Sequence, residues 1–167
     1  WSFDGDATTV SIDTVEIGAL NIKLRPQDSL VTFNRVYVAR NLSVSGQGGD
    51  DLITLRDVRL DGSTAIKAGG GNDIICFDES EVRGALSIDA GAGFDNVRMD
   101  TDLDNVVGEY LGPVKIALGA GDDYLQIGDA DVNGNSGHFI TRLTLTGGAG
   151  GDVLAYLANG NVFNLSP

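Results

Sequence analysis

The chain repeats one short pattern five times: a glycine-rich turn, an aspartate, and a run in which every second residue is apolar. The copies are GGDDLITL, GGGNDIICF, GAGFDNVRM, GAGDDYLQI and GAGGDVLAY. Their aspartates are separated by 22, 22, 28 and 29 residues. Self-similarity at a period of about 20 to 50 residues is typical of solenoids and related repeat architectures. The sequence therefore predicts a stack of similar structural units.

Each unit contains three apolar runs that alternate with the period of a half-buried β-strand. In the first run apolar residues stand two and four positions after the aspartate, as Ile75 and Phe77 do after Asp73. The second run is expected at Val58, Val82, Val106 and Val132. The third run precedes the next glycine turn and contains Ile66, Ile88, Ile116 and Leu145.

Three short strands per unit predict an all-β fold, a parallel β-helix (β-solenoid). The same apolar frame continues upstream of Asp51, which gives about seven coils of roughly 22 residues each. We expect a right-handed coil and a single domain over residues 1–167. A coil cannot bury its apolar face alone, so stability has to come from stacking on its neighbours.

Composition restricts the function. Acidic residues number 24 against 11 basic ones, a net charge of −13, which argues against nucleic acid and anionic membrane surfaces as partners. The apolar runs are far shorter than the roughly 18 residues that cross a bilayer, so no membrane insertion is expected. A single cysteine excludes an internal disulfide framework. The chain opens at Trp1 without a visible signal peptide, and we interpret it as a piece of a larger secreted protein.

The two longest coils carry their extra residues in loops expected at 105–113 and 133–142, between the second and third strands. Insertions that gather on one face of a solenoid often form its binding face, although loops also tolerate insertion at low entropic cost. The polar and aromatic side chains of a possible ligand patch on these loops are Glu109, Tyr110, Asn133, Asn135, His138 and Phe139.

Stacking would align the motif aspartates in a column with a spacing near 4.8 Å. At that distance like charges repel by roughly 1 kcal/mol in water and 3–4 kcal/mol at an effective dielectric constant of 20. Calcium could offset this repulsion, because it accepts six to eight oxygen ligands in flexible geometry. Alternatively, each aspartate accepts backbone N–H groups of its own turn and needs no ion. The candidate metal ligands are Asp51, Asp73, Asp95, Asp123 and Asp152.

The copies GGGNDIICF, GAGFDNVRM and GAGDDYLQI resemble the G-G-x-G-x-D-x-U-x nonapeptide of RTX (hemolysin-type) calcium-binding repeat proteins. The resemblance implies calcium held between successive turns by the aspartates and turn carbonyls. This chain departs from that family because its motif recurs once per coil and not every nine residues. Its overall rhythm is also similar to that of repetitive bacterial surface β-solenoid proteins, whose roles are structural or adhesive.

We therefore expect a structural or adhesive module of a secreted or surface bacterial protein, located outside the cell or on its surface. Glycans, other surface proteins, and further copies bound end to end or laterally are the expected partners. The alternative is a carbohydrate-binding or polysaccharide-cleaving β-helix that uses the loops 105–113 and 133–142. No nucleophile elbow, phosphate loop or HExxH motif occurs in the sequence, so we do not expect an enzyme.

Overall fold

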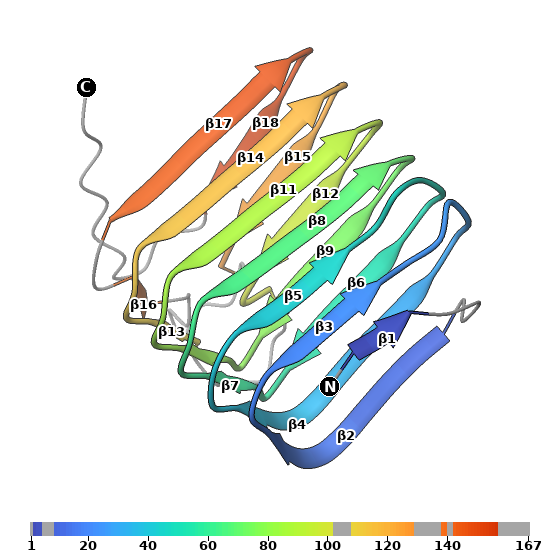
Figure 1. The fold of residues 1–167 in the computed structure, drawn as a ribbon. Helices are drawn as coiled ribbons and strands as arrows, with labels where there is room; N and C mark the ends of the chain where they lie inside the picture. The colour runs from blue at the N-terminus through green and yellow to red at the C-terminus, as the bar shows by residue number, and fades with distance from the viewer. Residues whose placement is uncertain (1, 5–8, 102–107, 129–137, 140–141, 157–167) are drawn as a thin grey trace.

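The computed structural model describes residues 2–4, 9–101, 108–128, 138–139 and 142–156. Over these residues the chain is all-β and contains no helix, and so none long and apolar enough to span a membrane. Parallel strands lie side by side in two sheets that curl around a shared core (Figure 1). This arrangement agrees with the predicted parallel β-helix.

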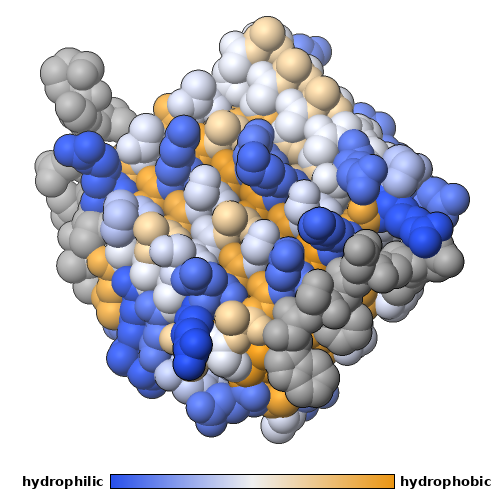
Figure 2. All heavy atoms as spheres, in the orientation of Figure 1, coloured by the Kyte–Doolittle hydropathy of each residue, from blue (hydrophilic) through white to orange (hydrophobic). Residues whose placement is uncertain are grey.

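The third apolar run of each repeat forms a seven-stranded parallel sheet. At its inward positions Ile22, Val44, Ile66, Ile88 and Ile116 lie next to one another in register, and each is 0–1% exposed. Hydrophilic and small side chains occupy the outer face of this sheet (Figure 2). Its strands, in spatial order, are β1 (Ser2–Asp4), β3 (Leu20–Lys23), β5 (Leu42–Ser45), β8 (Thr64–Gly70), β11 (Leu86–Ala92), β14 (Val114–Ala120) and β17 (Leu143–Ala149).

The second sheet combines the first and second apolar runs, because β4 is long enough to pair with a strand of each kind. In the first two coils one long strand holds both the first and the second run: β2 (Thr9–Ile17) and β4 (Leu30–Val38). In the later coils the first runs form β6 (Leu52–Arg56), β9 (Ile74–Asp78), β12 (Asn96–Met99), β15 (Tyr124–Ile127) and β18 (Val153–Tyr156). The second runs form the short strands β7 (Arg59–Leu60), β10 (Glu81–Val82), β13 (Glu109–Tyr110) and β16 (His138–Phe139). We call the series of second runs the short-strand ladder.

The alternation after each aspartate is confirmed. Ile75 and Phe77 point into the core and are fully buried, whereas Cys76 between them is only half-buried. Burying a large apolar side chain contributes about 1.5–3 kcal/mol, so each added coil stabilises the stack. At the last described coil the pattern weakens: Val153 and Leu154 are 51% and 52% exposed.

A row of left-handed residues forms the corner between the first and second runs. Thr14, Arg35, Asp57 and Glu79 have φ angles of 49–53° and follow one another in the parallel register. A left-handed residue that is not glycine is uncommon, and here it recurs in four successive coils. In the next coil the left-handed residue is Asp100 (φ 51°), directly after Met99, which pairs with Phe77. Asp100 therefore stands one register position before the one that Glu79 occupies in the preceding coil, at the point where the longer coil begins.

The predicted second strand of the two long coils is wrong. Glu109 and Tyr110 pair with Glu81 and Val82, so β13 takes the place that the sequence assigned to Val106. The extra residues therefore lie between the first and second strands, not between the second and third. Val106 and Val132 fall at 102–107 and 129–137, outside the described residues.

Candidate functional site

The predicted aspartate column exists at the turn that leads out of the seven-stranded sheet. Asp51, Asp73, Asp95 and Asp123 are 0–2% exposed, and Asp152 occupies the same place in the last described coil. Such burial of a carboxylate requires hydrogen-bonding partners, because an isolated buried charge is very costly.

The partners are backbone N–H groups of the preceding coil. Asp51 N–H donates to Asp73 Oδ1 over 2.7 Å and Asp73 N–H donates to Asp95 Oδ1 over 2.9 Å. The bonds from Asp95 to Asp123 and from Asp123 to Asp152 measure 2.8 and 3.2 Å. We call this series the inner ladder. The local alternative predicted bonds within one turn, whereas these bonds join neighbouring coils.

A second series, the outer ladder, runs beside it in the opposite direction. Where the residue before the column position is Asp or Asn, its side chain accepts an N–H group from the following coil: Asp50 N–H donates to Asp28 Oδ1 and Asn72 N–H to Asp50 Oδ1, over 2.8 and 2.7 Å. Phe94 N–H continues the ladder to Asn72, and Gly151 N–H donates to Asp122 farther along the stack. The sequence signal for this ladder is the recurrence of Asp or Asn at this position, at Asp28, Asp50, Asn72 and Asp122.

Glycine lets these turns approach one another closely. Gly91 has φ 119°, and a Cβ atom placed there would lie 1.9 Å from the carbonyl oxygen of Gly69. A Cβ atom placed on Gly93 would likewise lie 1.9 Å from the carbonyl oxygen of Gly71. Adjacent turns are therefore in direct backbone contact, and no side chain fits between them.

The inner ladder carries an electrostatic cost. Burial raises the pKa of Asp73 to about 6, with a smaller contribution from the neighbouring charges of Asp51 and Asp50. The pKa of Asp95 rises to about 6 for the same reason, burial first and then the charges of Asp73 and Asp123. The backbone N–H bonds act in the other direction, because they favour the ionised form. The Oδ2 atoms of the four buried aspartates have no hydrogen-bond partner among the described residues.

This geometry does not match the calcium site that the RTX resemblance implies. Calcium needs six to eight oxygen ligands, but the Oδ1 atoms already accept N–H groups and the turns leave no gap at their glycines. Among the described residues, no group of three or more His, Cys, Asp or Glu side chains could hold a metal ion. The aspartates are therefore placed as predicted, but they face the backbone.

The predicted ligand patch is only partly at the surface. Glu109 is exposed on β13, whereas Tyr110 points inward and is fully buried, so its assignment to the patch is wrong. His138 and Phe139 form β16 and pair with β13. Asn133 and Asn135 lie outside the described residues.

Tyr110 instead is buried beside Asp100. Burial raises the pKa of the Asp100 carboxyl to about 7 and holds the pKa of the Tyr110 hydroxyl group well above its ordinary value. Gly108 N–H donates to Asp100 Oδ1 over 3.1 Å. This bond joins the two ends of the insertion, because Asp100 precedes it and Gly108 follows it.

Comparison with protein-family models, with curated proteins and with solved structures finds no match to this chain.

Proposed function

We propose that this chain is a structural β-solenoid module: a right-handed rod of about seven coils, each with roughly 22 residues and three short strands. The observation that supports this most directly is the pair of opposed ladders. They commit the recurrent acidic side chains to backbone N–H groups of neighbouring coils. The repeat is thereby explained by stacking alone, and the proposed role requires no reaction.

The proposed setting is a secreted or surface bacterial protein, in which the rod spaces or presents other parts. The net charge of −13 supports this role, because a strongly charged surface keeps an extended stack soluble and limits nonspecific association. Adhesion to surface partners would use the outer faces of the strands, since the interior is filled by apolar side chains.

Calcium is not part of the proposed role, and a melting experiment tests this. We expect the melting temperature of the full chain to be the same, within about 2 °C, in excess calcium, in excess magnesium and in a chelator. A ligand that binds only the folded state at 100 times its Kd would add about 2.7 kcal/mol, which is readily detected. A large rise specific to calcium would show that the ion is a component of the rod.

Carbohydrate binding through the loops 105–113 and 133–142 is less well supported than the sequence suggested. Tyr110, the aromatic residue of the first loop, is in the core, and most of the second loop lies outside the described residues. A different part of the surface offers better-defined chemistry for such a ligand.

A further inference from the structure

A cleft of about 400 Å³ lies at the corner between the first and second runs. Three successive coils line it, each with one residue of the left-handed row and one outward residue of the short-strand ladder. Val36 and Val58 lie at the base of the cleft but belong to the core, with 2% exposure each, so the accessible apolar surface is that of the half-buried Tyr37 ring and the arginine side-chain carbons. The polar and aromatic residues around it are Arg35, Tyr37, Asp57, Arg59, Glu79 and Glu81.

The cleft repeats along the stack. Tyr37, Arg59 and Glu81 occupy the same register position in adjacent parallel strands, and Arg35, Asp57 and Glu79 precede them by two residues in each coil. Successive members are therefore spaced by about 4.8 Å, the distance between strands. Such a surface suits an extended ligand lying parallel to the stack axis.

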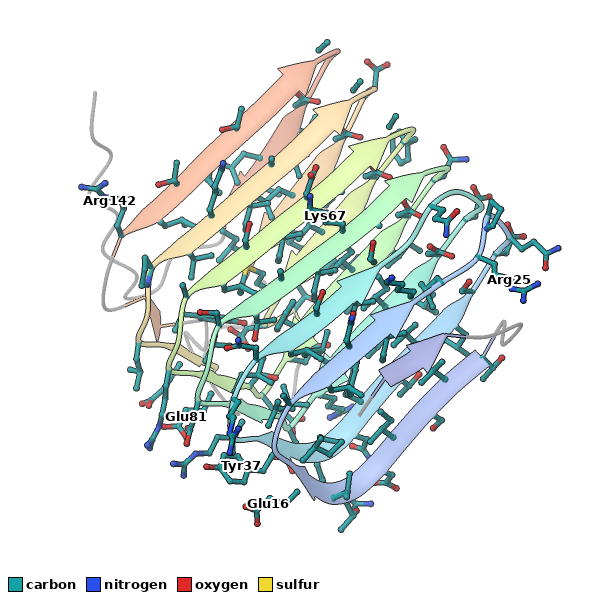
Figure 3. The ribbon with its side chains drawn as sticks, viewed as in Figure 1. Glu16, Arg25, Tyr37, Lys67, Glu81 and Arg142 are labelled. Atoms are coloured by element: carbon teal, nitrogen blue, oxygen red, sulfur yellow. The ribbon has the colours of Figure 1, made fainter. Side chains whose placement is uncertain are left out.

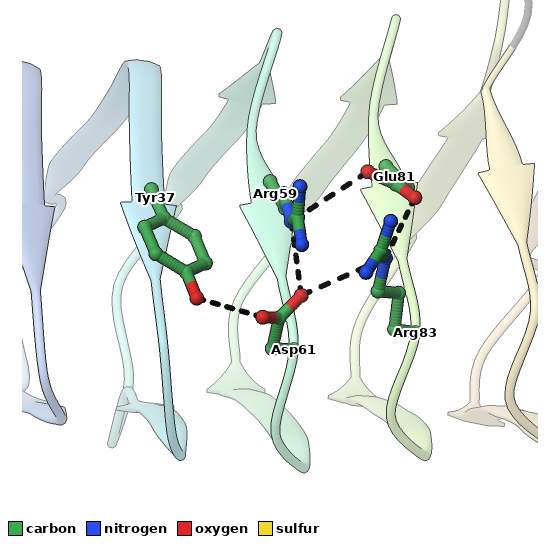
Figure 4. A network of polar contacts seen from close by, with 5 residues as sticks. All are labelled: Tyr37, Arg59, Asp61, Glu81 and Arg83. Atoms are coloured by element: carbon green, nitrogen blue, oxygen red, sulfur yellow. Dashed lines mark hydrogen bonds and ion pairs between the residues drawn. The ribbon is translucent and has the colours of Figure 1, made fainter.

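A polar network fixes one wall (Figure 4). The Tyr37 hydroxyl group donates to Asp61 Oδ2 over 2.7 Å and Arg59 Nε donates to Asp61 Oδ1 over 3.0 Å. Arg83 Nε donates to Glu81 over 2.7 Å. The Arg59 guanidinium lies 5.2 Å from the centre of the Tyr37 ring, within cation–π range. These contacts hold the side chains in place before any ligand arrives, which reduces the entropy cost of binding.

The network also fixes the protonation states. The hydrogen bond from Arg59 lowers the pKa of Asp61, and the bond to Asp61 raises the pKa of Tyr37. At neutral pH Asp61 is therefore a carboxylate and Tyr37 a neutral phenol. Tyr37 and Glu81 both lie at the edge of the molecule formed by the short-strand ladder (Figure 3).

Charge is nearly balanced around the cleft, whose lining holds two arginines and three carboxylates, although the whole chain carries −13. Arg35 pairs with Asp13 at 3.2 Å, Arg56 with Glu79, and Arg59 with Asp61. An ionic ligand would have to compete with these pairs. An uncharged polyhydroxyl ligand can accept from the guanidinium groups and donate to the carboxylates while the pairs remain, and its C–H faces can contact the exposed part of the Tyr37 ring.

We propose that this cleft binds a neutral oligosaccharide laid along the stack axis. This goes beyond the structural role, which does not require a ligand. The bound oligosaccharide would extend over two to three coils, because the residues that line the cleft come from three successive coils.

The test uses the full chain labelled with ¹⁵N and titrated separately with the hexaoses of cellulose, xylan, starch and chitin, and with an oligogalacturonate. We expect at least one neutral oligosaccharide to shift the backbone signals of Arg35, Asp57 and Arg59 and the Nε–H signal of Arg59. The oligogalacturonate is expected to have little effect.

Two variants locate the site. Arg35→Asn and Asp57→Asn each place a residue that tolerates the left-handed conformation, so the corner should keep its shape. Together they should weaken binding at least tenfold. Thr14→Asn, on the same row but outside the cleft, is the matched control and should bind as the unaltered chain does.

Three results would overturn the proposal: no cleft shift with any neutral oligosaccharide, binding of the acidic one alone, or unchanged affinity in the double variant. The shift map of the unaltered chain decides the question even if the double variant folds poorly. None of these results affects the structural role, and the melting experiment with calcium and a chelator is independent of them.

Discussion

Asp73 connects three consecutive coils through its carboxylate and its backbone N–H group. Its Oδ1 atom accepts the Asp51 N–H group, while its own N–H group donates to Asp95. Both bonds are buried, so losing one acceptor leaves an N–H group without water or a partner. Such a loss costs about 1–3 kcal/mol, more than most surface substitutions cost.

We predict that Asp73→Ala lowers the free energy of unfolding by about 1–3 kcal/mol. Asp73→Asn should cost less, because its amide oxygen can still accept the Asp51 N–H group. Urea unfolding at pH 7 measures both. Asp89→Ala, at an outward position on β11, is the control and should change stability by no more than about 0.5 kcal/mol. Equal losses of unfolding free energy in Asp73→Ala and Asp89→Ala would contradict a stabilising role for the inner ladder.

At this scale the sequence predicted where the aspartates lie but not what they bind. The spacing placed Asp51 to Asp152 in one column, since any regular stack aligns equivalent residues. Whether a carboxylate faces an ion or a neighbouring amide depends on how closely adjacent turns pack. The separation of the aspartates along the sequence does not reveal this. The outer ladder was missed for the same reason.

Among the elements, the glycine turn imposes the tightest steric limit on the stack. Gly91 combines a positive φ with direct contact against the Gly69 carbonyl. Gly70, one residue after Gly69, is different: a Cβ atom there would meet nothing closer than 3.8 Å, and its register partner in the next coil is Ala92. Adjacent glycines in one turn therefore differ in what they tolerate.

We predict that Gly91→Ala destabilises the fold by about 3 kcal/mol or more, because the added methyl group overpacks backbone that has no room to move. Gly70→Ala should be neutral or stabilising by up to about 1 kcal/mol, since alanine lowers the entropy of the unfolded chain. Circular dichroism during urea unfolding compares the two variants. Similar stabilities would contradict the observed turn packing.

Strands with strict alternation were predictable, and the short second strands were not. The first and third runs contain several alternating apolar residues, so their inward faces are unambiguous. A second strand has only two residues in most coils, and a single apolar position defines it. In the long coil Val106 and Tyr110 both qualified, and the insertion removed the spacing that would have distinguished them.

For the whole molecule, the buried carboxylates make stability depend on pH. Burial raises the pKa of Asp73 and Asp95 to about 6 and that of Asp100 to about 7, from an ordinary value of 3.8. The folded chain therefore binds more protons than the unfolded chain between about pH 4 and pH 7. Since stability falls with rising pH wherever the folded state holds the extra protons, neutralising the medium from the acid side must weaken the fold.

We predict that the free energy of unfolding is greatest near pH 4, the ordinary pKa of these carboxyls, and falls as the pH rises through 5, 6 and 7. Each buried carboxylate should account for a loss on the order of 1–3 kcal/mol. Urea unfolding from pH 4.5 to 8.5 at constant ionic strength gives the curve. The double variant Asp73→Asn, Asp95→Asn should flatten it between pH 5 and 7. Stability that increases with pH over this range would contradict the assignment.

The overall architecture was the most predictable level. A period near 22 residues, three apolar runs and abundant turn glycines leave few alternatives to a stack of parallel strands. The corner of left-handed residues was not predicted, because Thr14, Arg35, Asp57 and Glu79 share no side-chain chemistry. The cleft is lined by residues of that corner, so it could not be predicted from the sequence either.

The opposed directions of the two ladders give the layers interchangeable surfaces. Consider an imaginary cut between the turn at Asp50–Asp51 and the turn at Asn72–Asp73. The lower face would present the Asp51 amide hydrogen and an Asp50 oxygen, and the upper face the Asn72 amide hydrogen and an Asp73 oxygen. Each face offers one donor and one acceptor at matching places. A layer could thus be duplicated, removed or exchanged without redesigning those above and below, so such a molecule can change its length in whole-layer steps.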